Sequence, residues 1–338
     1  MKKTVLILGA NGFIGNSLVE HILRKTDWHI TALDLQAHHL NDYLNNPRFY
    51  FKQGDMRAEK DWVEQQIQIC DVILPLVAIA TPATYVQDPL RIFELDFEAN
   101  LAIVRLCVKY HKRVVFPSTS EVYGMCPDEA FDEETSVLVT GPIHKQRWIY
   151  ACAKQMMDRI IYAYGEKEAL SYTLFRPFNW IGAKLDNVLN PQPGGSRVIT
   201  QFVGNIMRGE SIVLVNGGEQ RRSFIDIDDG IGALVNIIDN KNQCADQKIF
   251  NIGYPENEYS IRQLAEMLID LLKNYPKHAT QAAKTKLVVE NGEAYFGKGY
   301  QDVARRVPTI HRAKKDLQWA PKIDLKTSLK KILDYHLL

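Results

Sequence analysis

The stretch Gly9-Ala10-Asn11-Gly12-Phe13-Ile14-Gly15 decides the fold of this 338-residue chain. It lies between the aliphatic run Thr4–Leu8 and an amphipathic pattern over Phe13–Arg24. Three glycines at this spacing, between a strand and a helix, are typical of a loop that binds the pyrophosphate of a dinucleotide. The first glycine allows a tight turn, the second lets backbone approach the phosphates, and the third lets the helix pack on the strand. The N–H groups of the first helical turn, at Phe13, Ile14 and Gly15, can then bind the anion.

A carboxylate at the end of the second predicted strand supports this interpretation, because a glycine triplet alone also fits an ordinary strand-to-helix turn. Asp34 follows Gly15 by 19 residues, close to the ~20 expected of a carboxylate that binds the adenosine ribose. It would repel a 2′-phosphate and no arginine follows it, so NAD is favoured over NADP. Asp55, with Met56 beside it, is placed to reach the adenine, although a turn aspartate is an equally good interpretation.

Short β-type runs alternate with helical patterns through the first half of the chain. Strands are expected at Thr4–Leu8, His29–Leu35, Phe49–Gln53, Val72–Leu76, Arg113–Pro117 and Tyr172–Phe175, and helices at Phe13–Arg24, Phe93–Tyr110 and Trp148–Tyr164. This alternation predicts an α/β protein with a Rossmann doubly wound parallel sheet. The alternation of strand and helix patterns ends after Arg176-Pro177, where glycine, proline and asparagine cluster. We therefore expect an NAD-binding domain at 1–178 and a smaller C-terminal α/β substrate-binding lobe at 179–338, with some segments interleaved with the first domain.

Within the second lobe, Ser260 and Gln263 form a predicted capping box that opens a helix over Ser260–Leu272. Asp324–Tyr335 is expected to be a terminal helix. Asn274–Lys286 has no clear periodicity and is expected to be a loop.

Composition excludes several classes of partner. Lys plus Arg total 41 against 40 Asp plus Glu. The net charge is therefore too small to attract the chain to nucleic acid or an anionic membrane. The longest apolar run, Val72–Ala80, is far short of the ~20 residues of a membrane helix. Five scattered cysteines without a C-x-x-C pair argue against a disulfide framework or a zinc site. We expect a cytoplasmic enzyme that uses no metal.

A candidate proton-handling pair lies on the predicted helix after the fifth strand. Tyr150 and Lys154 are four residues apart, so both project from one face. The lysine ammonium and an oxidised nicotinamide, both positive, would lower the tyrosine pKa from ~10 and let Tyr150 take a hydroxyl proton as hydride leaves carbon. A solvated helix face is the usual explanation of an isolated Tyr-x-x-x-Lys.

Polar residues at the end of the strand Arg113–Pro117 strengthen the case for catalysis, because open α/β proteins bind ligands at the carboxyl edge of the sheet. Hydroxyls at Thr119 and Ser120 can orient the reacting alcohol. Glu121 at the same edge is either a general base or a structural carboxylate.

Together with Arg176-Pro177-Phe178-Asn179, these motifs resemble the extended short-chain dehydrogenase/reductase superfamily over essentially the whole chain. Within it, Leu74–Pro82, Phe116–Cys126 and Gly297–Val303 resemble the UDP-glucuronic acid decarboxylases, such as the C-terminal module of the bifunctional polymyxin-resistance enzyme. The resemblance implies oxidation of C4 of UDP-glucuronic acid by NAD, followed by loss of carbon dioxide, with release of a UDP-4-keto-pentose and NADH. The chain offers no room for the formyltransferase module, so a free-standing decarboxylase or a role in another pathway is expected.

The resemblance also implies roles for individual residues. Glu121 would be the proton acceptor, Arg306 the proton donor to C5, and Thr119 and Ser120 would contact the sugar. Six further residues match substrate-binding positions of the family, namely Ala80, Tyr85, Arg147, Asn179, Arg222 and Tyr300.

Local sequence leaves the arginines open to other interpretations. Arg305-Arg306 would by default be a solvated basic pair, and a guanidinium is an unusual acid because its pKa exceeds 12. Arg306 could instead anchor a carboxylate or relay a proton through water. Arg221-Arg222 suits a diphosphate by bidentate pairing, and a surface pair is about equally consistent.

Several alternative functions remain. The enzyme could keep its NADH and reduce the ketone to UDP-xylose. 4,6-Dehydratases and 4-epimerases of sugar nucleotides share the Rossmann and Tyr-Lys motifs but not the segment that leads to Arg306. A scaffold that binds NAD without turnover is disfavoured by the presence of both Tyr150 and Lys154. The resemblance further suggests a homo-oligomer paired through the helices near Phe93–Tyr110 and Trp148–Tyr164, although burial within one chain would also explain their apolar faces.

Overall fold

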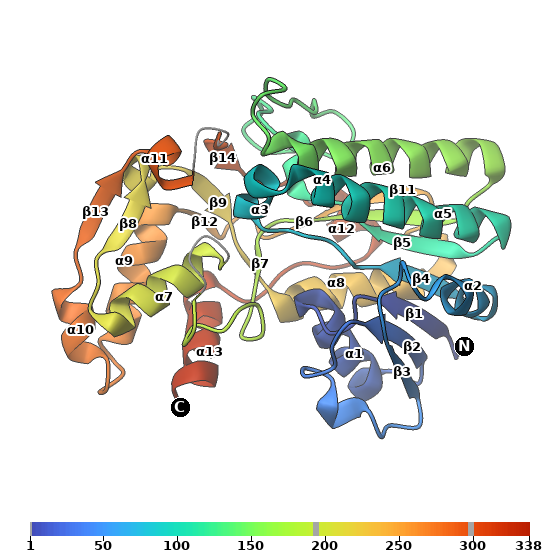
Figure 1. The fold of residues 1–338 in the computed structure, drawn as a ribbon, viewed down its shortest axis with the longest axis horizontal. Coiled ribbons are helices and arrows are strands. Elements are labelled where there is room, and N and C mark those ends of the chain that lie inside the picture. Colours follow the sequence, from blue (N-terminus) through green and yellow to red (C-terminus); the bar gives the residue numbers. More distant parts are fainter. Residues whose placement is uncertain (1, 192–195, 297–300) are drawn as a thin grey trace.

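The computed structural model describes residues 2–191, 196–296 and 301–338 of the chain. A parallel sheet of seven strands in the order β11-β6-β5-β4-β1-β2-β3 forms the centre of the larger lobe (Figure 1). The strands are β1 (Thr4–Leu8), β2 (His29–Asp34), β3 (Phe49–Gln53), β4 (Val72–Pro75), β5 (Arg113–Pro117), β6 (Tyr172–Pro177) and β11 (Lys248–Ile252). The predicted Rossmann fold class is confirmed.

Helices cover both faces of this sheet, which explains why the central strands β1, β4 and β5 are almost continuously apolar. Val5 and Ile7 of β1 pack on one face with helices α1 (Phe13–Lys25) and α8 (Ile227–Asp239). Leu6 and Leu8 pack on the other face with α2 (Lys60–Ile69), α5 (Asn100–Lys109) and α6 (Trp148–Glu168). Figure 1 shows α5 and α6 side by side above the sheet and α1 below it.

One predicted helix differs from expectation. The segment expected as a single helix over Phe93–Tyr110 directly follows α4 (Pro89–Ile92). It begins as a π-helical stretch η2 (Phe93–Ala99) and becomes α-helical only at Asn100. π-Helical turns recur at functional sites. This one places Asp96 inside the protein beside α6.

The second lobe has an apolar core of its own. Helices α7 (Val198–Arg208), α9 (Ile261–Leu272) and α13 (Leu325–Leu337) enclose it. The capping box between Ser260 and Gln263 is confirmed, as is a helix at the C-terminus. The expected loop at Asn274–Lys286 is wrong, because α10 (Ala279–Lys284) lies there. Only Ala282 of that helix is buried, so the sequence carries no helical periodicity.

Short strands connect the two lobes. A three-stranded sheet in the order β12-β9-β14 is formed by β9 (Arg221–Ser223), β12 (Glu258–Ser260) and β14 (Arg305–Arg306). Residues 227–252 return to the Rossmann sheet as α8 and β11. The remaining elements are η1 (Asn41–Tyr43), α3 (Pro82–Gln87), η3 (Ser120–Tyr123), β7 (Trp180–Ile181), β8 (Ile212–Val215), η4 (Asn216–Gly218), β10 (Ile225–Asp226), η5 (Lys241–Gln243), β13 (Leu287–Glu290), α11 (Gly292–Phe296) and α12 (His311–Asp316). Among the described residues, no helix is long and apolar enough to cross a membrane.

Candidate active site

The glycine loop has the shape that a dinucleotide requires. Gly9 adopts a φ of 91°, and a Cβ at Gly15 would lie 2.4 Å from the Gly9 carbonyl oxygen, so close packing of α1 on β1 depends on both glycines. A Cβ at Gly12 would meet only that same oxygen, at 3.3 Å, so the loop is otherwise open there. Gly12 caps α1 without a side-chain hydrogen bond, and no acidic residue lies in the first turn. The N–H groups of Phe13, Ile14 and Gly15 therefore fit a pyrophosphate.

The two predicted adenosine carboxylates differ in their surroundings. Asp34 ends β2 and its Oδ2 accepts a hydrogen bond from the Asn11 backbone N–H at 2.9 Å, which places the carboxylate against the glycine loop. Asp55 accepts the Arg57 backbone N–H at 2.8 Å and pairs with its guanidinium at 2.7 Å, as the turn interpretation expects. Met56 is buried in the core on the face of the sheet that α2, α5 and α6 cover. The residues present therefore fit NAD best at the glycine loop and Asp34.

Tyr150 and Lys154 lie at the carboxyl edge of the sheet, and both side chains are buried, with exposed fractions of 6% and 1%. The Lys154 ammonium donates to the Pro117 carbonyl oxygen at the end of β5, at 2.9 Å. It also lies 5.9 Å from the centre of the Tyr150 ring. Helix α6 therefore places Tyr150 and Lys154 together beside the last residues of β5.

The phenol of Tyr150 is enclosed by residues from three other elements. Tyr85 of α3 stacks on its ring with centroids 4.8 Å apart and an interplanar angle of 6°. Burial raises the pKa of Tyr150 well above its ordinary value, and the charge of Asp96 raises it further. A hydrogen bond from Thr119 acts in the opposite direction. In the protein without cofactor, desolvation of the phenolate therefore outweighs the lowering of the Tyr150 pKa that we expected from Lys154.

The lysine is subject to the same competition. Burial lowers the pKa of Lys154, while the carboxylates of Asp96 and Asp158 raise it. Asp158 accepts hydrogen bonds from Ser118 at 2.8 Å and from Arg176 at 3.0 Å, so it ties α6 to the ends of β5 and β6. This network fixes the helix that carries Tyr150 and Lys154.

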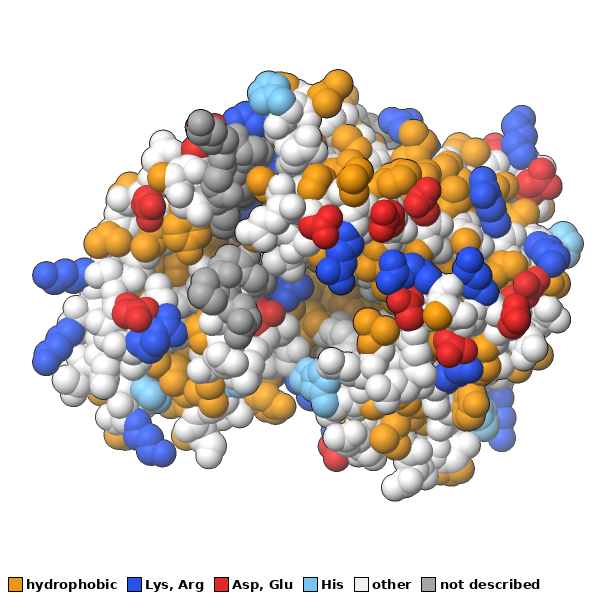
Figure 2. All heavy atoms as spheres, in the orientation of Figure 1, with side chains coloured by type: hydrophobic (Ala, Val, Ile, Leu, Met, Phe, Trp, Pro, Cys, Tyr) orange, Lys and Arg blue, Asp and Glu red, His pale blue; other side chains and the backbone are white. Residues whose placement is uncertain are grey.

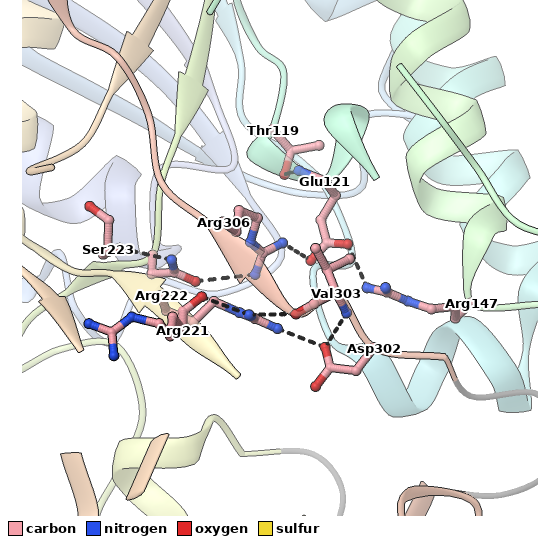
Figure 3. A network of polar contacts seen from close by, with 10 residues as sticks. Thr119, Glu121, Arg147, Arg221, Arg222, Ser223, Asp302, Val303 and Arg306 are labelled. Atoms are coloured by element: carbon pink, nitrogen blue, oxygen red, sulfur yellow. Dashed lines mark hydrogen bonds and ion pairs between the residues drawn. The ribbon is translucent and has the colours of Figure 1, made fainter. Parts of the chain in front are cut away.

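Glu121 lies between two guanidiniums. Its Oε2 accepts a hydrogen bond from Arg147 at 2.6 Å, and its Oε1 accepts one from Arg306 (Figure 3). Burial alone would raise the pKa of Glu121, but the charges of Arg147 and Arg306 outweigh burial and hold it at about 2. The structure thus brings together three residues that lie up to 185 positions apart in the sequence.

A second arginine cluster adjoins this one. Arg222 donates to the Val303 carbonyl oxygen and to the Asp302 carboxylate, both at 2.7 Å. Asn179 has a φ of 41° and donates to the Ser223 carbonyl oxygen at 2.8 Å, while its own side-chain oxygen lies 3.3 Å from Arg306. Figure 3 shows the side chains of Arg147, Arg222 and Arg306 converging on one region.

The other predicted site residues are placed less centrally. Ser120 is buried in the first turn after Thr119. Ala80 is exposed in the connection between β4 and α3. Tyr300 lies outside the described residues.

Two buried carboxylates were missed by sequence reasoning, Asp96 and Asp158. Asp96 is fully buried and its Oδ2 accepts the Ile79 backbone N–H at 3.1 Å. Burial raises the pKa of Asp96 to about 6, although the charge of Lys154 lowers it. Because Glu94 and Glu98 stand on either side of Asp96 in the same stretch, the sequence does not distinguish the buried acid from its neighbours.

The cysteines are free, and no group of three or more metal-ligating side chains occurs in the part of the chain that the structure describes.

Comparison with known proteins places this geometry in a family. A model of the NAD dependent epimerase/dehydratase family matches residues 5–253. The PbgP3 protein of Burkholderia pseudomallei is 52% identical, with 100% of this chain and 97% of that chain covered, at a TM-score of 0.90.

More distant structures share the fold. UDP-glucuronic acid 4-epimerase from Bacillus cereus, in complex with UDP-glucuronic acid and NAD, is 20% identical over 98% of both chains, at a TM-score of 0.81. UDP-glucose 4-epimerase from Thermotoga maritima is 22% identical over 98% of both chains, at a TM-score of 0.79. The chain belongs to the NAD dependent epimerase/dehydratase family, an extended short-chain dehydrogenase/reductase family, and its cofactor is NAD.

Proposed function

We propose that this enzyme catalyses the NAD-dependent oxidative decarboxylation of UDP-glucuronic acid to a UDP-4-keto-pentose, with release of carbon dioxide and NADH. The observation that carries the proposal is the position of Glu121 and its two guanidinium partners beside the Tyr150–Lys154 pair. An alcohol-oxidising pair needs no such cluster for a neutral sugar. A sugar that carries a carboxylate next to the reacting carbon does require such a cluster, because its negative charge must be bound.

The first step is oxidation of the C4 hydroxyl. NAD, held by the glycine loop and Asp34, supplies the acceptor for the hydride. Tyr150 takes the hydroxyl proton, and the Thr119 hydrogen bond favours the phenolate that must form. Because burial raises the pKa of Tyr150, proton acceptance depends on positive charge near the phenol. Lys154, fixed against the Pro117 carbonyl, carries such a charge.

The second step follows from the position of the new ketone, which is β to the C6 carboxylate. When the bond between C5 and C6 breaks, carbon dioxide leaves and the electron pair moves into an enolate at C4 and C5. Protonation at C5 completes the ketone, so the proton released in the first step is balanced by the one taken up here. Guanidiniums near the carboxylate orient it and stabilise the enolate charge.

The guanidiniums of Arg147 and Arg306 also affect how Glu121 can act as the expected proton acceptor. A carboxylate with a pKa of about 2 is a weak base. A substrate carboxylate that takes over one guanidinium removes part of the charge that lowers the pKa of Glu121. Glu121 then becomes a stronger base in the complex than in the free protein. In the decarboxylation, Arg306 acts as an anchor for the substrate carboxylate or relays a proton to C5 through a water molecule.

The test is incubation with UDP-glucuronic acid and NAD, followed by measurement of NADH absorbance and identification of the sugar by NMR. A UDP-4-keto-pentose with stoichiometric NADH supports the proposal. UDP-xylose without net NADH would instead show that the ketone is reduced before release. Tyr150→Phe is the control and should form no NADH while still binding NAD. Turnover of UDP-glucose at an equal rate would contradict a role for the guanidinium cluster.

We also propose that two copies pair through the helices near Phe93–Tyr110 and Trp148–Tyr164, which are η2, α5 and α6, together with the adjoining α4. Figure 2 shows hydrophobic side chains gathered over these helices. Leu90 is 71% exposed, and Met156 and Tyr162 of α6 are about half exposed. Large apolar side chains gathered on one face are typical of protein–protein contact surfaces.

A further inference from the structure

The strand that carries Arg306 has an unusual pairing. β14 consists of Arg305 and Arg306 and runs parallel to β9, with Arg305 opposite Arg221 and Arg306 opposite Arg222. Four guanidiniums therefore extend from two adjacent strands. Like charges directly opposite each other destabilise a strand pair, so this short pairing needs negative charge to hold it.

The two faces of the pairing carry separate sets of carboxylates. Successive side chains of a strand point to opposite faces, and Figure 3 shows Arg221 leaving β9 on the side opposite to Arg222. On the face of the candidate active site, Glu121 pairs with Arg306 and Asp302 pairs with Arg222. On the other face, Arg221 and Arg305 share a single carboxylate, Glu258.

Glu258 binds both arginines tightly. Its Oε1 accepts from the Nε atoms of Arg221 and Arg305, each at 2.7 Å, and its Oε2 accepts from Nη2 of Arg305 at 2.7 Å. The contact with Arg305 is thus bidentate, the strong and directional form of this ion pair. Glu258 itself begins β12, the strand on the other side of β9.

We propose that Glu258 is a positioning residue for the active site, which sets Arg222 and Arg306 in place by fixing the neighbouring residue of each. The role is mechanical: Glu258 joins β12, β9 and β14 on the far face, so that Arg222 of β9 points toward Asp302 and Arg306 of β14 points toward Glu121. The consequence for carbon dioxide release rests on the proposed function, whereas the consequence for the placement of Arg222 does not.

Glu258 is available for this role at neutral pH. Hydrogen bonding to Arg305 and Arg221 holds the pKa of Glu258 at about 2, against the effect of its partial burial. Its side chain is 16% exposed, whereas those of Arg221 and Arg305 are 42% and 37% exposed, so water partly screens both pairs.

The test compares Glu258→Gln with Glu219→Gln in the full-length enzyme. Glu219 also pairs with an arginine of this lobe, Arg262, but is 76% exposed and far weaker in its geometry, at 3.4 Å. A shift of ~1 Å in a catalytic group can cost about 10²-fold in rate. We therefore expect Glu258→Gln to lower kcat for carbon dioxide release by about 10²-fold and to raise KM for UDP-glucuronic acid, with KM for NAD unchanged. Glu219→Gln should match the parent enzyme.

The variant Arg306→Lys serves as a second background, which distinguishes positioning of Arg306 by Glu258 from a merely structural role of Glu258. In Arg306→Lys, the addition of Glu258→Gln should cost much less in kcat than in the parent enzyme, because the effect passes through Arg306. An equal cost in both backgrounds, or a kcat unchanged by Glu258→Gln, would overturn the proposal.

Failure of the proposed function would look different. If the parent enzyme released no carbon dioxide, UDP binding measured by calorimetry would replace the rate. Glu258→Gln should then weaken UDP binding as much as Arg222→Lys does, and unchanged UDP affinity would overturn the positioning role.

Discussion

Replacing Glu121 by glutamine should destabilise the protein while leaving the shape of the side chain intact. Glu121 follows β5 in the Rossmann lobe, whereas its partner Arg306 comes from β14 near the second lobe. Arg147, the other partner, is 4% exposed. Loss of the carboxylate charge removes a negative partner that Arg147 and Arg306 share.

The magnitude follows from the pKa of Glu121, which falls from 4.5 to about 2 on folding. At 1.36 kcal/mol for each pKa unit, this difference corresponds to about 3 kcal/mol of stability at neutral pH. For a chain of this length the unfolding entropy is such that about 3 kcal/mol lowers the Tm by roughly 4 °C. Removal of one member of a buried pair leaves the other uncompensated, which acts in the same direction.

The assay is thermal unfolding of the protein without cofactor, for the parent and for Glu121→Gln, across a range of pH. Because folding lowers the pKa of Glu121, its contribution is fully present above about pH 4.5 and is lost as pH falls toward 2. The Tm difference should therefore be constant from pH 7 to pH 5 and shrink at pH 4 and below. Glu210→Gln, which removes an exposed pair with Arg208, is the control. A Tm difference of zero at pH 7, or one that grows on acidification, would refute the reasoning.

The remaining predictions concern the cofactor loop, the buried acid and the subunit contact. Gly15→Ala places a Cβ only 2.4 Å from the Gly9 carbonyl oxygen, so the glycine loop must shift, and NAD binding measured by calorimetry should weaken about tenfold or more; unchanged affinity would remove this role from the third glycine. The Asp96 carboxylate raises the pKa of Tyr150, so Asp96→Asn should move the acid limb of the pH–rate profile for NADH formation to lower pH, and a move to higher pH would contradict it. Met156→Glu should convert a dimer to monomers in light scattering, and an unaltered mass would exclude Met156 from the interface.

Much of the Rossmann lobe could be predicted because its signals are local. The glycine spacing, the aliphatic run Thr4–Leu8 and the position of Asp34 each act within one βαβ unit, and the structure has them where the sequence indicates. The pair Tyr150 and Lys154 could be predicted for the same reason, since four residues on a helix fix their relation.

The arginine clusters could not be predicted in this way. β14 is two residues long, too short for any periodicity. Its ion pairs join residues that are 47 and 185 positions apart, so their partners are set by tertiary packing alone. The π-helical stretch at Phe93–Ala99 likewise has a pattern that an ordinary helix would share.

The most direct test of the proposed reaction follows the carboxylate carbon itself. UDP-glucuronic acid labelled with carbon-13 at C6 is incubated with the enzyme and NAD, and both the gas phase and the remaining sugar nucleotide are measured. If the proposed reaction occurs, labelled carbon dioxide appears in step with loss of substrate, and Tyr150→Phe releases none. Complete retention of the label in a C4 epimer of the substrate would contradict it, and would make the enzyme an epimerase instead.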